Sequence, residues 1–165
     1  LVSIYPIFSV RSYFNGLRQY EGLYGLTWMR NQYPDDWAAV GYLNQAVGET
    51  PLPILVEADG DSYTDYARFS AFTGMPTIIG WPVHEWLWRG TYDVVAPRRE
   101  DVRQIYESED LDLTRTILVR YGVQYVIVGT LERQKYPALQ EWKFGRLGEV
   151  AFQQGVTTVY KLRGY

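Results

Sequence analysis

The fold is decided by the stretch Val123-Gln124-Tyr125-Val126-Ile127-Val128, which ends at Gly129. Its β-branched and aromatic residues suit a pleated, buried surface and a glycine stops it, so the stretch predicts a buried strand. Helical patterns precede it over residues 113–121 and follow it over residues 132–140. A strand that stands between helices is typical of an α/β domain.

Shorter apolar runs on the amino-terminal side predict two more buried strands, at residues 54–58 and 77–80. Toward the carboxyl end, runs at residues 150–153 and 157–162 flank Gly155, which predicts a hairpin with a tight turn. Apolar residues at three-to-four spacing predict further helices, over residues 34–47, 61–72 and 98–108. This alternation implies an α/β fold with a mostly parallel sheet and flanking helices, Rossmann-like and three-layered, with a C-terminal antiparallel hairpin.

The length of the chain, 165 residues, is ordinary for one domain, and a hydrophobic content of 47% excludes a disordered chain. Residues 1–33 are rich in tyrosine and glycine and lack a sustained period, so they predict an irregular N-terminal arm. Residues 34–165 are expected to form a single α/β domain. Since residue 1 is not methionine and residues 1–10 are apolar but too short to span a bilayer, we expect an arm that follows a membrane segment.

Charge and cysteine content exclude several classes of function. The net charge is −3 and the basic residues are scattered, so the sequence offers no basic face for the phosphates of a nucleic acid. The absence of cysteine excludes disulfides, thiol catalysis and thiolate metal sites. Aromatic residues make up 16% of the chain, with fifteen tyrosines and six tryptophans. Such residues gather at interfaces, sugar-binding sites and membrane surfaces, although composition alone favours an aromatic-rich core.

Polar residues follow three of the predicted strands at the point where each strand ends. In α/β sheets, ligands bind beyond the carboxyl ends of the strands, so we expect a binding site at this edge, mainly within residues 57–89. The candidate ligand-binding residues are Glu57, Asp59, Arg68, Trp81, His84, Glu85, Trp88, Arg89, Glu132 and Arg133.

The only histidine, His84, lies next to Glu85. A zinc peptidase helix needs a second histidine four residues further on, and position 88 is a tryptophan, so that class is excluded. Histidine has an unperturbed pKa of about 6.5, and His84 and Glu85 are therefore the candidate catalytic acid and base. A hydrogen-bonded, purely structural His84 is an equal alternative.

Neither a metal nor a cofactor is expected. Residues 57–62 contain three carboxylates, as a cation-binding loop would, but they lack the spacing of the calcium-binding helix-loop-helix. Asp61 and Ser62 are instead expected to cap a helix. The glycines do not form the pattern of a nucleotide site, and the sequence has no Gly-x-Ser-x-Gly elbow of a hydrolase.

Tryptophans and arginines offer the chemistry of sugar and phosphate recognition. Trp81, Trp86 and Trp88 place three of the six tryptophans close together. Indole faces stack on sugar rings and lie at membrane interfaces, and packing against a neighbouring domain is an equal alternative. Arginine offers a bidentate fork to phosphate or carboxylate, and the candidates are Arg68, Arg89, Arg98, Arg99 and Arg133.

Two groups of longer motifs carry a resemblance to a known family. The first group is Glu57, Ser62-Tyr63, Arg68-Phe69-Ser70, Thr73-Gly74-Met75-Pro76-Thr77, Gly80-Trp81, His84-Glu85 and Trp88-Arg89. The second group is Arg99, Asp101-Val102, Ile105-Tyr106, Tyr121-Gly122-Val123, Tyr125-Val126, Val128-Gly129, Glu132-Arg133, Tyr136 and Val159-Tyr160-Lys161. With these motifs the chain resembles, over about residues 20–162, the C-terminal region of the "YYY" family of uncharacterised bacterial and archaeal multi-pass membrane proteins.

The resemblance implies a function. The "YYY" family is similar to membrane glycosyltransferases that use polyprenyl-phosphate sugars and carry extracytoplasmic C-terminal domains. The resemblance of this chain to that family therefore implies an extracytoplasmic accessory domain. Such a domain is attached to the transmembrane portion of the same protein and binds glycan or a polyprenyl-phosphate sugar. The catalytic carboxylate of such enzymes lies in a loop between membrane helices, so the resemblance implies a domain without catalysis of its own.

Two alternatives stay open at the level of the sequence. In the first, the cluster at residues 57–89 is a buried polar network of a structural domain that docks onto the membrane portion and binds no small ligand. In the second, the domain is an autonomous enzyme with His84 and Glu85 as acid and base, which requires a concave pocket that holds both side chains.

Overall fold

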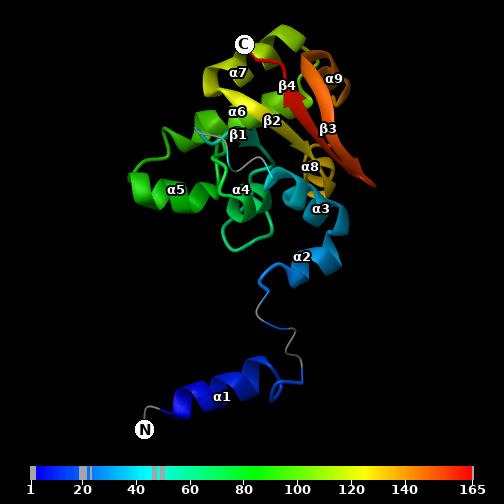
Figure 1. The fold of residues 1–165 in the computed structure, drawn as a ribbon. Coiled ribbons are helices and arrows are strands. Elements are labelled where there is room, and N and C mark those ends of the chain that lie inside the picture. Colours follow the sequence, from blue (N-terminus) through cyan, green and yellow to red (C-terminus); the bar gives the residue numbers. More distant parts are fainter. Residues whose placement is uncertain (1–2, 19–21, 23, 46–47, 49–50, 165) are drawn as a thin grey trace.

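The computed structural model describes residues 3–18, 22, 24–45, 48 and 51–164 (Figure 1). The helices are α1 (Ile4–Tyr13), α2 (Thr27–Gln32), α3 (Pro34–Leu43), α4 (Arg68–Thr73), α5 (Pro82–Arg89), α6 (Val95–Glu107), α7 (Leu111–Tyr121), α8 (Thr130–Lys135) and α9 (Trp142–Leu147). The strands are β1 (Ile54–Val56), β2 (Val123–Val128), β3 (Gly148–Gln154) and β4 (Thr157–Leu162).

The strands form one mixed sheet in the order β1-β2-β4-β3. β1 pairs with β2 in parallel, whereas β4 pairs with β2 and β3 in antiparallel orientation. The predicted strand at residues 123–128 and the C-terminal hairpin are present. The predicted mostly parallel, Rossmann-like sheet is wrong, because the hairpin places β4 directly against β2 and leaves β2 with a parallel neighbour on one edge only.

Residues 77–80 do not form the predicted strand. They contribute a single bridge, in which Thr77 lies opposite Leu55. The Ile78 carbonyl accepts a hydrogen bond from Arg98, and the Gly80 N–H donates to the Glu85 carboxylate. Because these backbone groups pair with side chains, they are not available for a strand ladder.

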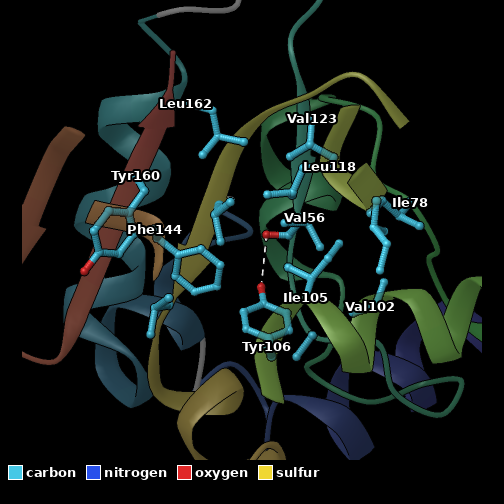
Figure 2. Close-up of a cluster of buried hydrophobic side chains, with 14 of the residues drawn as sticks. Val56, Ile78, Val102, Ile105, Tyr106, Leu118, Val123, Phe144, Tyr160 and Leu162 are labelled. Carbon is cyan, nitrogen blue, oxygen red and sulfur yellow. Dashed lines mark hydrogen bonds between the residues drawn. The ribbon is translucent and has the colours of Figure 1, made fainter. Parts of the chain in front are cut away.

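The core lies on both faces of the sheet, and β2 separates its two halves. Tyr125 and Ile127 point to one face, where α2, α3 and α4 pack. Val126 and Val128 point to the other face, where α6, α7 and α9 supply buried side chains. Successive residues of a strand face opposite sides, so one six-residue strand anchors both layers. Figure 2 shows part of the second half, in which the Tyr106 hydroxyl points to the Val56 carbonyl.

The segment after β1 departs from the predicted helix over residues 61–72. The helix in this segment, α4, begins only at Arg68, because Tyr63 and Ala67 both adopt a left-handed backbone with φ of +62°. A second difference is α5, which was not predicted. It begins with Pro82 in its first turn and ends at Gly90, whose φ is +73°. Proline at the start and glycine just after the end are common helix signals.

The N-terminal part contains two helices where an irregular arm was expected. α1 has no buried residue and lies apart from the other elements (Figure 1). α2 packs against α3, and its Met29 is fully buried. The division of the chain at residue 33 stays a prediction. In the part of the chain that the structure describes, we find no helix with the length and hydropathy that crossing a membrane requires.

Candidate functional site

The carboxyl ends of β1 and β2 meet at a buried group of charges. Arg68 donates from Nε to Asp36 Oδ2 over 2.8 Å and from Nη2 to Glu132 Oε2 over 3.0 Å. All three side chains are at most 1% exposed. The Glu132 carboxylate also accepts the backbone N–H groups of Ala58 and Gly129 at 2.9 Å each, which ties α8 to the ends of both strands.

The electrostatics of this group keep it charged. Burial alone would lower the pKa of Arg68, but the attraction of Glu132 and Asp36 outweighs burial and raises it. Burial alone would likewise raise the pKa of Glu132, but Arg68 and the Ala58 N–H hold it below its usual value. Asp36, in the first turn of α3, is fully buried and accepts the Thr157 hydroxyl at 2.5 Å.

Glu57 is a second buried carboxylate, and it caps α4. Its two oxygens accept the backbone N–H groups of Phe69 and Ser70 at 2.8 Å each. Burial raises the pKa of Glu57. Glu57, Arg68 and Glu132 were all expected to bind ligand, and all three instead use their hydrogen bonds inside the protein. These hydrogen bonds tie α4 and α8 to each other and to the ends of the strands.

The other half of the expected cluster lines an open pocket of about 760 Å³ between α4 and α5. We call this cavity the α5 pocket. Five expected residues lie on it, namely Trp81, His84, Glu85, Trp88 and Arg89. Six further lining residues were not predicted: Ala67, Ser70, Ala71, Met75, Pro76 and Thr77. Its volume is in the range of small-molecule sites.

Hydrogen bonds within the protein fix the positions of polar side chains that line the α5 pocket. Glu85 accepts the Gly80 N–H at 2.8 Å through Oε1 and Arg89 Nε at 3.2 Å through Oε2. Trp81 donates from Nε1 to the Tyr66 carbonyl at 3.0 Å, so its indole ring is fixed. The imidazole of His84 lies 5.3 Å from the Trp81 ring, centroid to centroid.

Two buried polar atoms at the α5 pocket have no partner among the described residues. These are His84 Nδ1 and the Thr77 hydroxyl oxygen. A buried polar atom without a hydrogen bond costs free energy, and it is normally paired by water or by a ligand. The pocket therefore combines polar atoms that lack a hydrogen-bond partner with apolar lining residues such as Met75 and Pro76. Trp88 stands at its rim and is 88% exposed.

The pocket that the enzyme hypothesis requires is present, since His84 and Glu85 both line it. The two oxygens of Glu85 are already bound to Gly80 and Arg89, however, and these contacts favour a positioning role for that carboxylate.

The two remaining expected residues lie elsewhere. Asp59 lines a separate pocket beside α6. Arg133 forms a bidentate pair with Glu141, at 2.7 and 3.0 Å, and also donates to the Val156 carbonyl in the hairpin turn. No group of three histidine, aspartate or glutamate side chains that could hold a metal ion occurs within the described residues.

Comparisons with known proteins bear on the fold. Neither a family model nor a curated protein matches the sequence, so the likeness to the "YYY" family stays a prediction. Among solved structures, the chain is similar to the crystal structure of the C-terminal globular domain of oligosaccharyltransferase from Archaeoglobus fulgidus. The TM-score is 0.50 at 8% sequence identity, and the match covers 78% of this chain and 97% of that one. The chain thus has a fold that resembles the C-terminal globular domain of an oligosaccharyltransferase.

Proposed function

We propose that the chain is an extracytoplasmic accessory domain of a membrane glycosyltransferase-like protein and that its α5 pocket binds glycan or a lipid-linked sugar. One observation carries this proposal: His84 and Thr77 each have a buried polar atom without a partner among the described residues, and both line a pocket that combines aromatic and aliphatic side chains with Ser70, Glu85 and Arg89. The likeness to an oligosaccharyltransferase domain concerns the fold alone. It therefore supports the general class of the parent protein and not the choice of ligand.

A sugar ring matches the two kinds of surface in the α5 pocket. One face of a pyranose consists mainly of C–H groups and packs on indole, here on Trp81 and Trp88. Its hydroxyl groups donate and accept hydrogen bonds, which His84 Nδ1 and the Thr77 hydroxyl can complete. Arg89 lies at the same pocket and can meet a phosphate group of a lipid-linked sugar.

Titration of the chain with sugars tests this assignment. We would follow amide chemical shifts while adding N,N′-diacetylchitobiose, methyl mannoside and a short-chain prenyl-phosphate mannose. The expected result is a shift at residues of α4 and α5, and its loss in Trp88→Ala. Trp142→Ala is the matched control, because Trp142 is also exposed and lies outside the α5 pocket. If no ligand shifts these residues at millimolar concentration, the proposal fails.

A second candidate function is docking onto the membrane portion of the same protein, and exposed apolar side chains favour it. Val83, Trp86 and Leu87 of α5 are 40%, 44% and 65% exposed. Leu87→Ser would then destabilise the assembled full-length protein and leave the isolated chain unchanged. Leu113→Ser, at an exposed position of α7, is the control. Equal effects of both variants in the assembled protein would argue against docking through α5.

A further inference from the structure

A second pocket, of about 290 Å³, lies beside α6 and is separate in its residues from the α5 pocket. Its wall contains Asp59 from the segment after β1, Arg99 and Arg103 from α6, and Lys135 from the end of α8. Ala96 and Glu100 of α6 and the hydroxyl-bearing side chains of Tyr92 and Tyr136 complete it.

The buried carboxylate of Asp59 binds several of the side chains that line this pocket. The residue is 2% exposed, and its carboxylate accepts Arg99 Nε at 2.9 Å, Lys135 Nζ at 2.6 Å and the Tyr136 hydroxyl at 3.0 Å. The Asp59 backbone carbonyl accepts Lys135 as well. With its oxygens occupied, Asp59 is not available to a ligand. It instead fixes the positions of a guanidinium and an ammonium group that come from different helices.

These two cations keep donors that the protein does not use. Arg99 binds Asp59 through Nε and the Tyr92 hydroxyl through Nη1, at 3.0 Å, and among the described residues its Nη2 has no hydrogen-bond partner. Lys135 has three N–H donors, of which Asp59 takes two. Tyr92 accepts from Arg99, so its own proton is free to donate. The Arg99 side chain is 41% exposed and that of Lys135 is 22% exposed, so solvent reaches both.

The positive charge of the pocket is concentrated at Arg99 and Lys135. Arg103 is held by Glu100 and Glu107 on its own helix, at 2.5 and 3.3 Å, so it attracts a ligand only weakly. Arg99 and Lys135 share a single carboxylate, Asp59. This pair therefore has one excess positive charge, whereas Arg103 together with Glu100 and Glu107 has one excess negative charge.

We propose that this pocket binds a small oxyanion of the phosphate class, with Arg99, Lys135 and Tyr92 as its donors. Phosphate accepts several hydrogen bonds at once, and the planar guanidinium with a neighbouring ammonium and hydroxyl supplies donors from three directions. A volume of about 290 Å³ accommodates a phosphate or pyrophosphate group and lies at the small end of ligand sites. The α5 pocket shares none of these residues, so each site can fail independently of the other.

Inorganic phosphate is the probe for the test, added at neutral pH in about 0.15 M salt so that non-specific attraction is screened. We expect saturable amide shifts at Asp59, Tyr92, Arg99 and Lys135 in the low millimolar range or below. Arg99→Gln should weaken binding by at least about tenfold, since charge-assisted hydrogen bonds are the strong ones. Arg115→Gln, on the exposed surface of α7, should not change it.

Two further measurements keep the test decisive if Arg99→Gln disturbs the fold. Tyr92→Phe removes only a hydroxyl at the rim and should weaken phosphate binding by a few fold, with an unchanged spectrum otherwise. Acetate should bind at least about tenfold more weakly than phosphate, because it carries less charge and fewer acceptor oxygens. Equal affinity for acetate, or no saturable shift with phosphate in the wild type, would overturn the assignment.

Discussion

Arg68 Nη2 and Glu132 Oε2 lie 3.0 Å apart across 64 residues of chain, with both side chains buried. This contact joins the start of α4 to the first turn of α8, and it lies where β1 and β2 end. Asp36 of α3 binds the same guanidinium at 2.7 Å. The edge of the sheet where α/β proteins commonly bind ligands is therefore closed by an internal ion network, and the open pockets lie beside it.

Replacement of Arg68 by Met should destabilise the protein by about 3–5 kcal/mol. It would leave the carboxylates of Asp36 and Glu132 buried without their cation, and an unpaired buried charge is costly. Urea denaturation measures the change in the free energy of unfolding. Arg115→Met, which breaks an exposed pair with Asp112, should cost at most about 1 kcal/mol. Similar values for both variants would show that the network does not hold the sheet edge together.

Gly129→Ala tests how closely the same network is packed around the end of β2. A Cβ at Gly129 would meet Asp36 Oδ1 well inside van der Waals contact, and Arg68 and Glu132 lie near it too. We expect a loss of about 1–3 kcal/mol from overpacking. Gly145→Ala in α9 is the matched control, because nothing lies within 4 Å of its added methyl group. That change should stabilise the protein by about 0.5–1 kcal/mol, since alanine favours helix more than glycine does.

Alkaline pH should destabilise the protein through its buried tyrosines. Burial raises the pKa of Tyr106 well above 10, and burial together with Asp59 raises that of Tyr136. Above pH 10 the unfolded chain releases these protons and the folded protein keeps them, so stability that is present below pH 10 is lost as the pH rises. The slope is at most about 1.4 kcal/mol per pH unit for each such tyrosine.

Urea denaturation between about pH 9 and 11 measures this slope around the unperturbed tyrosine pKa of about 10. Tyr106→Phe should make the slope shallower. The same variant loses hydrogen bonds to the Val56 and Ile127 carbonyls and should be less stable at neutral pH by about 1 kcal/mol or more. An identical slope in the wild type and in Tyr106→Phe would mean that the Tyr106 hydroxyl ionises in the folded protein.

The strand at residues 123–128 and the hairpin were predictable because their signals are local. Alternating or continuous apolar residues and a turn glycine lie within a few positions of one another. The error at residues 77–80 has a physical cause: Ile78 and Ile79 are 3% and 1% exposed, as in a buried strand, yet their segment is a loop tied by side chains. Burial alone makes a loop look like a strand, and strand order is not encoded locally.

For the candidate site, too, local sequence signals were predictive and long-range contacts were not. The sequence predicted a binding site mainly within residues 57–89, and five of the expected residues, between 81 and 89, line the α5 pocket. It could not separate this pocket from the buried network, since the pairing of Arg68 with Asp36 and Glu132 spans 32 and 64 residues. Lys135, whose contact with Asp59 spans 76 residues, was not predicted for the same reason. The helix over residues 82–89 could have been predicted, because Pro82 and Gly90 are common signals of a helix start and a helix end.

Thr77→Val distinguishes a ligand pocket from a structural feature at α5. The Thr77 hydroxyl oxygen is buried and has no partner among the described residues, and valine has nearly the same shape. If the hydroxyl serves only a ligand, its removal should leave the unliganded protein equally stable or stabilise it by up to about 1–3 kcal/mol, the cost of a buried unpaired group. Sugar binding measured by amide shifts should weaken, because a hydrogen bond to the ligand is lost. Thr114→Val is the control. The Thr114 hydroxyl donates to the Asp110 carbonyl at 2.8 Å and accepts from Lys143 at 3.0 Å. Its loss should therefore destabilise the protein and leave sugar binding unchanged. A Thr77→Val protein that is clearly less stable than the wild type, with no change in sugar binding, would instead make Thr77 part of the internal structure.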